Sequence, residues 1–139
     1  QYAVSNQIPL ILVDGPPGIG CPVIASVTGA SAVLIVTEPT PSGHHDMKRI
    51  LSLTKHFKIP AYVIINKADL SDEFCTRIQE TSEQSNSIVV GKISYNSLFT
   101  EAQLLGKSIL EVFPESNESK TIKSIANVMS HKMELQDTL

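Results

Sequence analysis

The chain carries four short apolar runs, each four to six residues long and rich in Val and Ile. They are Ile8–Val13, Ala32–Thr37, Ala61–Ile65 and the weaker Ser87–Val90. Within each run apolar residues occupy successive positions, which is typical of strands that helices cover on both faces of a parallel sheet. The pattern therefore predicts buried parallel strands.

Segments with helical periodicity separate and follow these runs. Ser71 is a predicted N-cap, because Asp72 and Glu73 follow it in the first turn, where carboxylates favour the helix dipole. A second helix is predicted from the spacing i, i+3, i+4 and i+7. Its apolar stripe is Met47, Ile50, Leu51 and Thr54. A C-terminal helix is predicted from about Ser116, with the stripe Ile122, Ile125, Ala126, Met129 and Met133.

Alternating strands and helices predict an α/β fold. Right-handed βαβ units produce a mostly parallel, open sheet with flanking helices. The length of 139 residues suits one domain, and we expect residues 136–139 to be a frayed tail.

Composition narrows the classes of function. Hydrophobic residues make up 42% and charged residues 18% of the chain, so a packed core is expected. The net charge of −3 argues against a nucleic-acid surface, and no apolar stretch reaches the roughly 18 residues of a membrane span. The two cysteines form neither a CxxC pair nor a disulfide framework, which favours the reducing cytoplasm.

Polar junctions follow the first three apolar runs, and ligands of open α/β sheets bind at the carboxyl ends of strands. The junctions begin at Asp14, Thr37 and Asn66. Because parallel strands end at the same edge of a sheet, these junctions together predict a nucleotide site.

Asp14 ends a predicted buried strand, where its charge needs compensation. A hydrated Mg²⁺ would provide it, and Gly18 would allow a backbone N–H to approach a terminal phosphate. Alternatively, Asp14 accepts backbone N–H groups in a tight turn.

The same junction contains no Walker A loop. Gly15 and Gly20 have the outer spacing of GxxxxGK[ST], but Cys21 and Pro22 stand where the Lys and the hydroxyl belong. The chain therefore lacks the lysine that reaches the β- and γ-phosphates.

The tetrad Asn66-Lys67-Ala68-Asp69 matches the NKxD pattern of proteins that recognise a purine edge. An amide both donates and accepts hydrogen bonds, and an Asp accepts from N–H donors. Turn formation is the alternative explanation, because Asn and Asp are frequent in turns.

With these motifs the chain resembles the C-terminal half of a MinD/ParA-type P-loop ATPase over almost its whole length. The segment 11–22, an Asp followed by Pro and Gly, is similar to the second phosphate-side motif of that superfamily. Segments 37–43 and 63–67 resemble most the MinD-like ATPases with an inserted ferredoxin domain. The superfamily also includes the nitrogenase iron protein and the cobyrinic acid a,c-diamide synthases.

The resemblance implies ATP and Mg²⁺ as cofactors. It implies that Asp14 holds the hydration shell of Mg²⁺ and that Gly18 senses the γ-phosphate. Asn66, within the tetrad that includes Lys67 and Asp69, would recognise adenine, and the loop around Ser94, Tyr95 and Asn96 would close over the base. The segment 39–43, which begins at Pro39, would line the nucleotide or the face of a homodimer.

The chain also departs from this family. The strand and Gly-rich loop that normally lie between the strand of Asp14 and the strand ending at Thr37 are missing from the sequence. Two cysteines cannot hold a four-cysteine iron–sulfur cluster, so such a cluster would lie outside this chain. The departures are explained if the chain is a piece of a longer ATPase or the product of a split gene, with the N-terminal half as partner. We expect negligible ATP hydrolysis by the chain alone.

Two alternatives stay open. NKxD is also compatible with a GTPase, although a glycine stands four residues after Asp14, where GTPases usually have it three residues after. The missing phosphate loop is compatible with a non-catalytic assembly module. A metal site at His44, His45 and Asp46 is disfavoured, because adjacent helical positions point about 100° apart.

Overall fold

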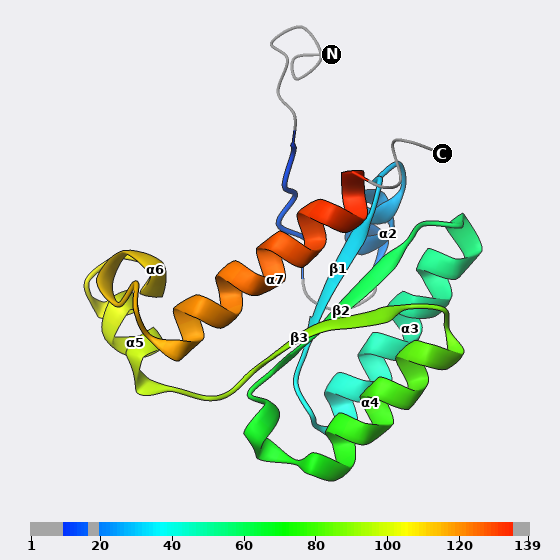
Figure 1. The fold of residues 1–139 in the computed structure, drawn as a ribbon. Helices are drawn as coiled ribbons and strands as arrows, with labels where there is room; N and C mark the ends of the chain where they lie inside the picture. The colour runs from blue at the N-terminus through cyan, green and yellow to red at the C-terminus, as the bar shows by residue number, and fades with distance from the viewer. Residues whose placement is uncertain (1–9, 17–19, 135–139) are drawn as a thin grey trace, which may run out of the picture.

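In a computed structural model, which describes residues 10–16 and 20–134, the chain forms a parallel sheet between helices (Figure 1). The described part contains a three-stranded sheet with the strand order β1-β2-β3. The strands are β1 (Val33–Thr37), β2 (Ala61–Asn66) and β3 (Ile88–Ile93). The helices are α2 (Cys21–Val27), α3 (Pro41–Phe57), the 3₁₀ turn η1 (Ala68–Leu70), α4 (Asp72–Gln84), α5 (Ser97–Leu104), α6 (Ile109–Val112) and α7 (Asn117–Glu134).

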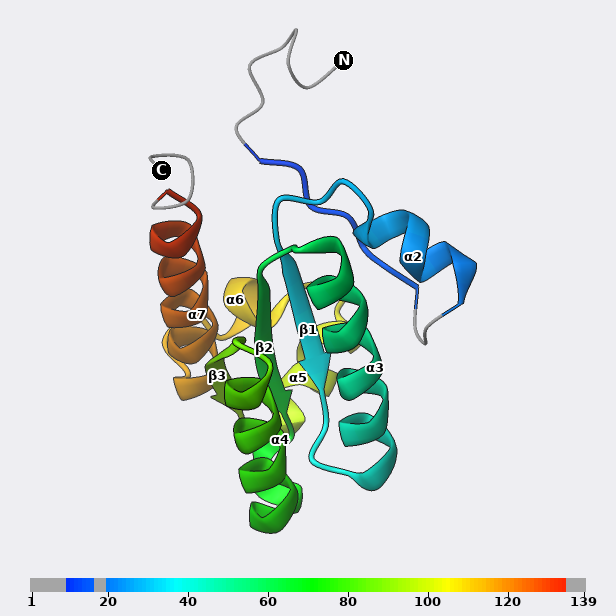
Figure 2. The same ribbon diagram turned by 90° about the vertical axis from the view of Figure 1, so that its right-hand side faces the viewer.

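The central strand β2 is covered on both faces. Helices α3 and α4 lie side by side on one face, and α7 lies on the other face over β3 (Figure 2). Val63 and Ile65 point toward α3 and α4, and both are fully buried. Tyr62 and Ile64, on the opposite face, are also buried. This two-sided burial explains why the sequence of β2 is apolar at successive positions.

The sequence predicts the cap of α4 at Ser71, which is confirmed, but not the cap of α3 at Thr40. Thr40 caps α3 by accepting from the Gly43 N–H at 3.0 Å, and Ser71 caps α4 by accepting from the Phe74 N–H at 3.3 Å. The predicted stripe of α3 is confirmed, because Met47 and Leu51 are buried in the cluster under the sheet. The C-terminal helix begins at Asn117, one residue after the predicted start.

The first predicted strand is wrong where the structure describes it. Residues 10–13 form no strand and are largely exposed; Leu12, for example, is 86% exposed. Ile8, where the predicted strand begins, lies outside the described residues. A strand is stable only when its backbone N–H and C=O groups are paired. In the described part of the chain no strand lies beside residues 10–13, so their apolar sequence alone does not place them in the sheet.

The outer side of β1 is open. Ile35 and Thr37 are buried against the α3 side, whereas Leu34 and Val36 on the other face are 43% and 61% exposed. Within residues 10–16 and 20–134, β1 pairs only with β2, in the parallel register Leu34↔Tyr62 and Val36↔Ile64. The sheet therefore ends at a free edge, with part of one apolar face uncovered.

Gly91 allows α7 to pack closely on β3. A Cβ built at this position would lie well inside van der Waals contact with Cγ1 and Cδ1 of Ile125. Ile125 is itself buried, and Gly91 pairs with Ile64 next to the register shift between β2 and β3. The contact fixes how near the C-terminal helix comes to the sheet.

We expect Gly91→Ala to lower the free energy of unfolding by about 1–3 kcal/mol, because the added methyl overpacks the Ile125 contact. Gly15→Ala is the matched control, since a Cβ there meets nothing within 4 Å. Chemical denaturation of both variants measures the difference. In a double-mutant cycle, Gly91→Ala should cost less when Ile125 is already Ala; an equal cost in both backgrounds would contradict the contact.

His44 joins α3 to α4. Its Nε2 lies 2.8 Å from the Thr81 hydroxyl, and its ring meets Phe74 edge-on at 6.3 Å between centroids. Burial lowers the pKa of His44 below its usual 6.5, and the nearby cations Lys48 and Arg77 lower it further. The neutral imidazole is therefore the form that this interface stabilises.

Stability should consequently depend on pH near neutrality. Between the lowered pKa of His44 and 6.5 the unfolded chain binds more protons than the folded chain, so stability rises with pH across that window. We expect the free energy of unfolding to fall as the pH drops below about 6.5, and His44→Gln to flatten that dependence. His131→Gln, at an exposed position of α7, is the control. Equal slopes for wild type and His44→Gln would contradict the prediction.

Candidate nucleotide site at the strand ends

The carboxyl ends of β1, β2 and β3 lie at one edge of the sheet, because the strands are parallel. Three junctions leave this edge: Glu38–Thr40 after β1, Lys67–Asp69 after β2 and Ser94–Asn96 after β3. The structure thus brings together the second and third predicted junctions and the predicted base-side loop. The first junction lies within the described residues at 14–16 and 20–21, and Gly18 lies outside them.

Glu38 and Lys67 tie the ends of β1 and β2 together. Lys67 Nζ lies 2.7 Å from Glu38 Oε1, and each side chain is 40% exposed. The hydrogen bond to Glu38 raises the pKa of Lys67, followed by the charge of Glu38 and a smaller effect of Tyr95. Lys67 has a positive φ of 51°, which turns the chain sharply after β2. The lysine of the tetrad is therefore engaged by a carboxylate.

Asp69 ties the end of β2 to the loop after β3. Its Oδ1 accepts a hydrogen bond from the Tyr95 backbone N–H at 2.6 Å. The Tyr95 side chain is 61% exposed, and Ser94 beside it is also exposed. The aspartate of the tetrad thus holds the position of the predicted base-side loop.

Asn66 is the tetrad residue with an open side chain. It ends β2, is half-buried, and its side-chain amide has no hydrogen-bond partner among the described residues. The amide offers both donors and an acceptor at the edge of the sheet. A ligand with alternating donors and acceptors would satisfy it.

Asn96 has a different role from the other two loop residues. Its side-chain oxygen accepts from the Leu98 N–H at 3.0 Å, which caps α5. Its amide nitrogen donates to Glu118 Oε1 of α7 at 2.7 Å. Both ends of this side chain are engaged, so it supports the loop and leaves Ser94 and Tyr95 as the exposed members.

Pro39 is fully buried beneath the start of α3. Beside it, Gly43 lets the β1–α3 turn pack closely, because a Cβ there would press on the Glu38 carbonyl and on the Thr37 hydroxyl. The ring of Pro39 therefore contributes packing in this structure, while Ser42, next to the Thr40 cap, is exposed.

Asp14 is exposed and has no hydrogen bond or ion pair within the described residues. The tight-turn alternative, in which its carboxylate accepts backbone N–H groups, stays open, because residues 17–19 lie outside the described residues. A free carboxylate oxygen is the kind of ligand that Mg²⁺ prefers, directly or through its water shell.

No group of three or more His, Cys, Asp or Glu residues that could hold a metal ion occurs in the described residues. His44 is engaged with Thr81, and His45 Nδ1 lies 3.4 Å from Oδ1 of its neighbour Asp46. Cys75 is buried, and its thiol donates to the Ala68 carbonyl at 3.2 Å, whereas Cys21 is exposed. Burial raises the pKa of the Cys75 thiol, which suits a packing residue.

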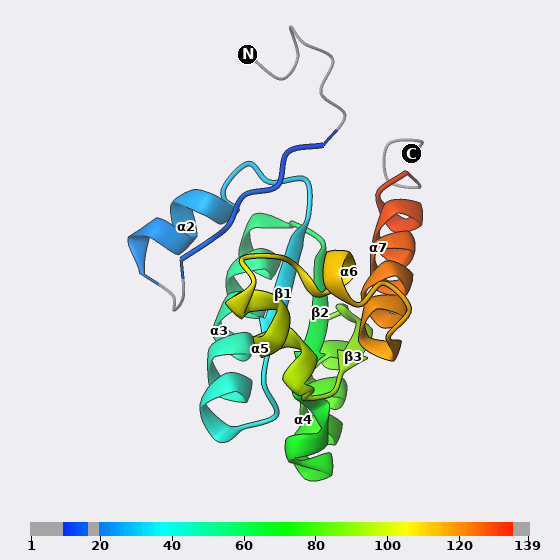
Figure 3. The same ribbon diagram turned by 90° about the vertical axis from the view of Figure 1, so that its left-hand side faces the viewer.

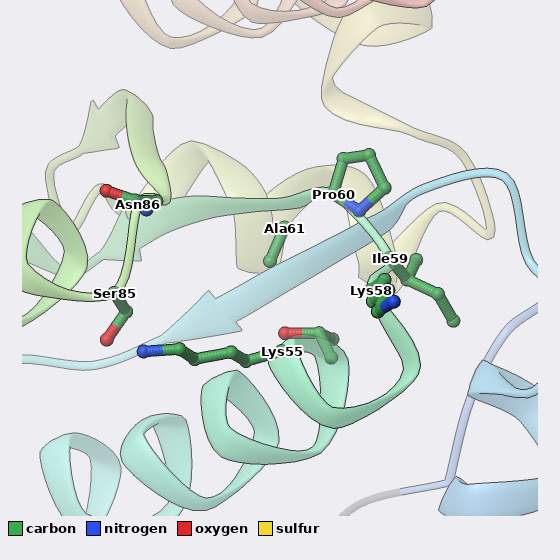
Figure 4. Close-up of a pocket in the computed structure, with 8 residues that line it drawn as sticks. Lys55, Lys58, Ile59, Pro60, Ala61, Ser85 and Asn86 are labelled. Atoms are coloured by element: carbon green, nitrogen blue, oxygen red, sulfur yellow. The ribbon is translucent and has the colours of Figure 1, made fainter.

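A hollow of about 360 Å³ lies at the opposite end of the sheet (Figure 4). It is formed where α3 and α4 end and β2 begins, and Lys55 extends across it toward Ser85. The carbonyl ends of two helices converge there, and the cations Lys55 and Lys58 are among the lining residues. The hollow is separate from the strand-end site and contains none of the predicted ligand-binding residues.

Sequence reasoning missed the partners of the tetrad. The opposite charges of Glu38 and Lys67, each directly after a strand, were a usable signal, because neighbouring parallel strands place such residues together. The Asp69 bond to the Tyr95 backbone left no such signal, since every residue but proline has a backbone N–H.

Among the described helices, none is long and apolar enough to cross a membrane.

Curated proteins resemble the chain over parts of their length. An uncharacterized protein of Methanocaldococcus jannaschii is 38% identical over 72 residues, 52% of this chain and 27% of that protein. An uncharacterized ATP-binding protein of the same organism is 23% identical over 89% of this chain and 47% of its own length. A cytosolic Fe–S cluster assembly factor of Danio rerio is 22% identical over 92% of this chain and 53% of its own length. The chain thus spans about a quarter to a half of these relatives.

Solved structures agree on the fold. The cell division ATPase MinD of Pyrococcus furiosus superposes with a TM-score of 0.76 at 18% identity, covering 93% of this chain and 54% of MinD. A ParA family ATPase of Chlorobium tepidum superposes with a TM-score of 0.60 at 27% identity, covering 76% and 44%. No protein-family model matches the chain. The strand-end site and these superpositions together identify the fold as that of the MinD/ParA-type P-loop ATPases, of which this chain spans about half.

Proposed function

We propose that the chain is the base-side and magnesium-side part of an ATP-binding domain of the MinD/ParA type. The observation that carries the proposal is the open Asn66 amide at the end of β2, beside a loop that Asp69 holds in place. The ATP-binding relative and the ATPases of the same fold support the nucleotide class. Asn66 would hydrogen-bond the base, and Ser94 and Tyr95 would line it.

Asp14 would hold the hydration shell of Mg²⁺, and Gly18 would approach the terminal phosphate. The exposed carboxylate of Asp14 fits a hard cation that keeps most of its waters. When bound, Mg²⁺ neutralises charge on the phosphate oxygens. The contribution of this chain is to hold the ion through Asp14 and to orient the base through Asn66.

A phosphate loop would have to come from another segment, because the sequence contains no Gly-rich loop with a Lys. The open edge of β1 supports this, since it leaves room for one further parallel strand. The exposed Leu34 and Val36 support a helix packed on the same face, and the exposed apolar residues 10–13 would pair with the far side of the added strand. The proposed partner is thus a strand–loop–helix unit, as in an N-terminal half of the domain. By resemblance, the assembled protein would act as a homodimer.

Iron–sulfur chemistry, if the complete protein has it, would be located outside this chain. One relative is an Fe–S cluster assembly factor, but in this chain Cys75 is buried in the core and Cys21, the second cysteine, is exposed. Cluster binding needs several thiolates converging on one point. The cluster would therefore require cysteines that this chain does not supply.

We expect MgATP to bind the chain alone only in the millimolar range and to be hydrolysed negligibly. Amide NMR titration should show shifts at Asn66 and at Ser94–Tyr95, and Asn66→Ala should abolish them, because the base would lose its hydrogen-bond partner. Asn127→Ala, on the exposed side of α7, is the control. Micromolar affinity with steady turnover, or no shift at the strand ends, would overturn the proposal.

Because one face of β1 is exposed, we expect the chain to remain folded when a charged side chain is placed on that face. We expect Val36→Lys to change the free energy of unfolding of the chain alone by less than about 1 kcal/mol, because that side chain is already in water. Val63→Lys, at a fully buried position of β2, should unfold the chain. Thermal melts of both variants test this. A large loss for Val36→Lys would show that the face is already covered in solution, as in an assembly of identical chains.

A further inference from the structure

The hollow of about 360 Å³ between the ends of α3 and α4 and the start of β2 lies at the end of the sheet opposite the strand-end site (Figure 4). Its volume falls in the range of small-molecule sites, about 300–1,000 Å³. The lining residues that matter for its chemistry are Lys55, Lys58, Ile59, Pro60, Ser85 and Asn86. None of them belongs to the strand-end site, so a ligand of the hollow would be bound separately from a nucleotide.

Four of these side chains present polar groups that the chain does not use. Lys55 and Lys58 carry ammonium groups, and Ser85 and Asn86 carry a hydroxyl and an amide. Within residues 10–16 and 20–134, none of the four side chains forms a hydrogen bond or an ion pair. None of the eight lining residues is acidic. The hollow therefore combines two positive charges with two neutral hydrogen-bond donors, and no carboxylate of its own lining neutralises them.

The helix ends do not reverse this charge. The C-terminus of a helix is equivalent to about half a negative elementary charge, so α3 and α4 together contribute about one, against two full positive charges of the lysines. The terminal carbonyl groups also have partners in the backbone. The Ile59 N–H donates to the Thr54 carbonyl and the Ser87 N–H donates to the Ser82 carbonyl, each at 2.9 Å. The hollow therefore favours an anion.

The backbone at Lys58 supports a role for this side chain beyond stability. Lys58 ends α3 with a φ of 56°, in the left-handed region, which glycine adopts at the least cost. Asn86, with a φ of 55°, belongs to the few other residue types that visit this region routinely. Lysine has no such advantage, so stability alone would favour glycine at position 58. What lysine adds there is an ammonium group in the lining of the hollow.

We propose that the hollow binds the phosphate group of a small phosphomonoester through the ammonium groups of Lys55 and Lys58. Ser85 and Asn86 would act as additional hydrogen-bond donors. A phosphomonoester carries a charge of about −1.5 to −2 at pH 7 and three strong acceptor oxygens, which match this set of donors. A carboxylate offers one charge and two oxygens. The apolar residues 59–61 would contact the organic part of the ester.

Amide NMR titration of the chain with glycerol 3-phosphate, at constant ionic strength, tests the site. We expect saturable shifts of the Ser85 and Asn86 amides, and weaker binding of inorganic phosphate, which has no organic part to contact residues 59–61. Lys55→Ala should lower the affinity about tenfold, because one charge-assisted hydrogen bond is lost. Lys48→Ala removes the same charge from an exposed position of α3 outside the hollow and is the matched control.

Lys58→Gly separates binding from stability. It should raise the denaturant midpoint of unfolding, because glycine suits the left-handed backbone, and at the same time lower the affinity for glycerol 3-phosphate about tenfold. Unchanged affinity in both Lys55→Ala and Lys58→Gly, an equal loss in Lys48→Ala, or no saturable shift at Ser85 and Asn86 would overturn the site. Inorganic phosphate that binds as tightly as the ester would overturn the assignment of an organic phosphate.

Discussion

The parallel pairing of β2 with both of its neighbours is the constraint on which this structure depends. Parallel strands need crossover connections, and here α3 and α4 supply them on one face of the sheet (Figure 3). Because every strand then runs the same way, all three carboxyl ends fall at one edge. The buried core of β2, with Val63 and Ile65 fully enclosed, fixes that register. The position of Asn66 at the strand-end site is a direct consequence.

Two polar interactions connect the loops at this edge of the sheet. The Glu38–Lys67 pair joins the first two strand ends, and the Asp69 bond to the Tyr95 N–H joins the second to the third. Exposed ion pairs contribute little to stability, commonly under about 1 kcal/mol. Their effect is on geometry: they hold three connecting loops in fixed positions around an open amide. The loops at the strand ends are thus held in position by the chain's own contacts.

The strand β1 forms the free edge of the described sheet, and Glu38 at its carboxyl end belongs to the strand-end site. At this edge the sheet formed by the described residues ends, and Leu34 and Val36 are exposed beside it. Exposed edges invite pairing with another strand. The open edge of β1 is therefore suited to pairing with a further strand.

The sequence by itself determined the fold class, three of the four predicted strands, the cap at Ser71, and the location of Asn66 and Asp69 at a strand end. These features follow from local patterns, such as apolar runs and capping side chains, whose physical causes lie within a few residues. Only the tertiary structure decided that residues 10–13 stay outside the sheet, that Pro39 is buried, and that Asp69 is held by Tyr95. Those outcomes depend on which backbone groups from distant segments are near enough to pair, and a local pattern contains no such information.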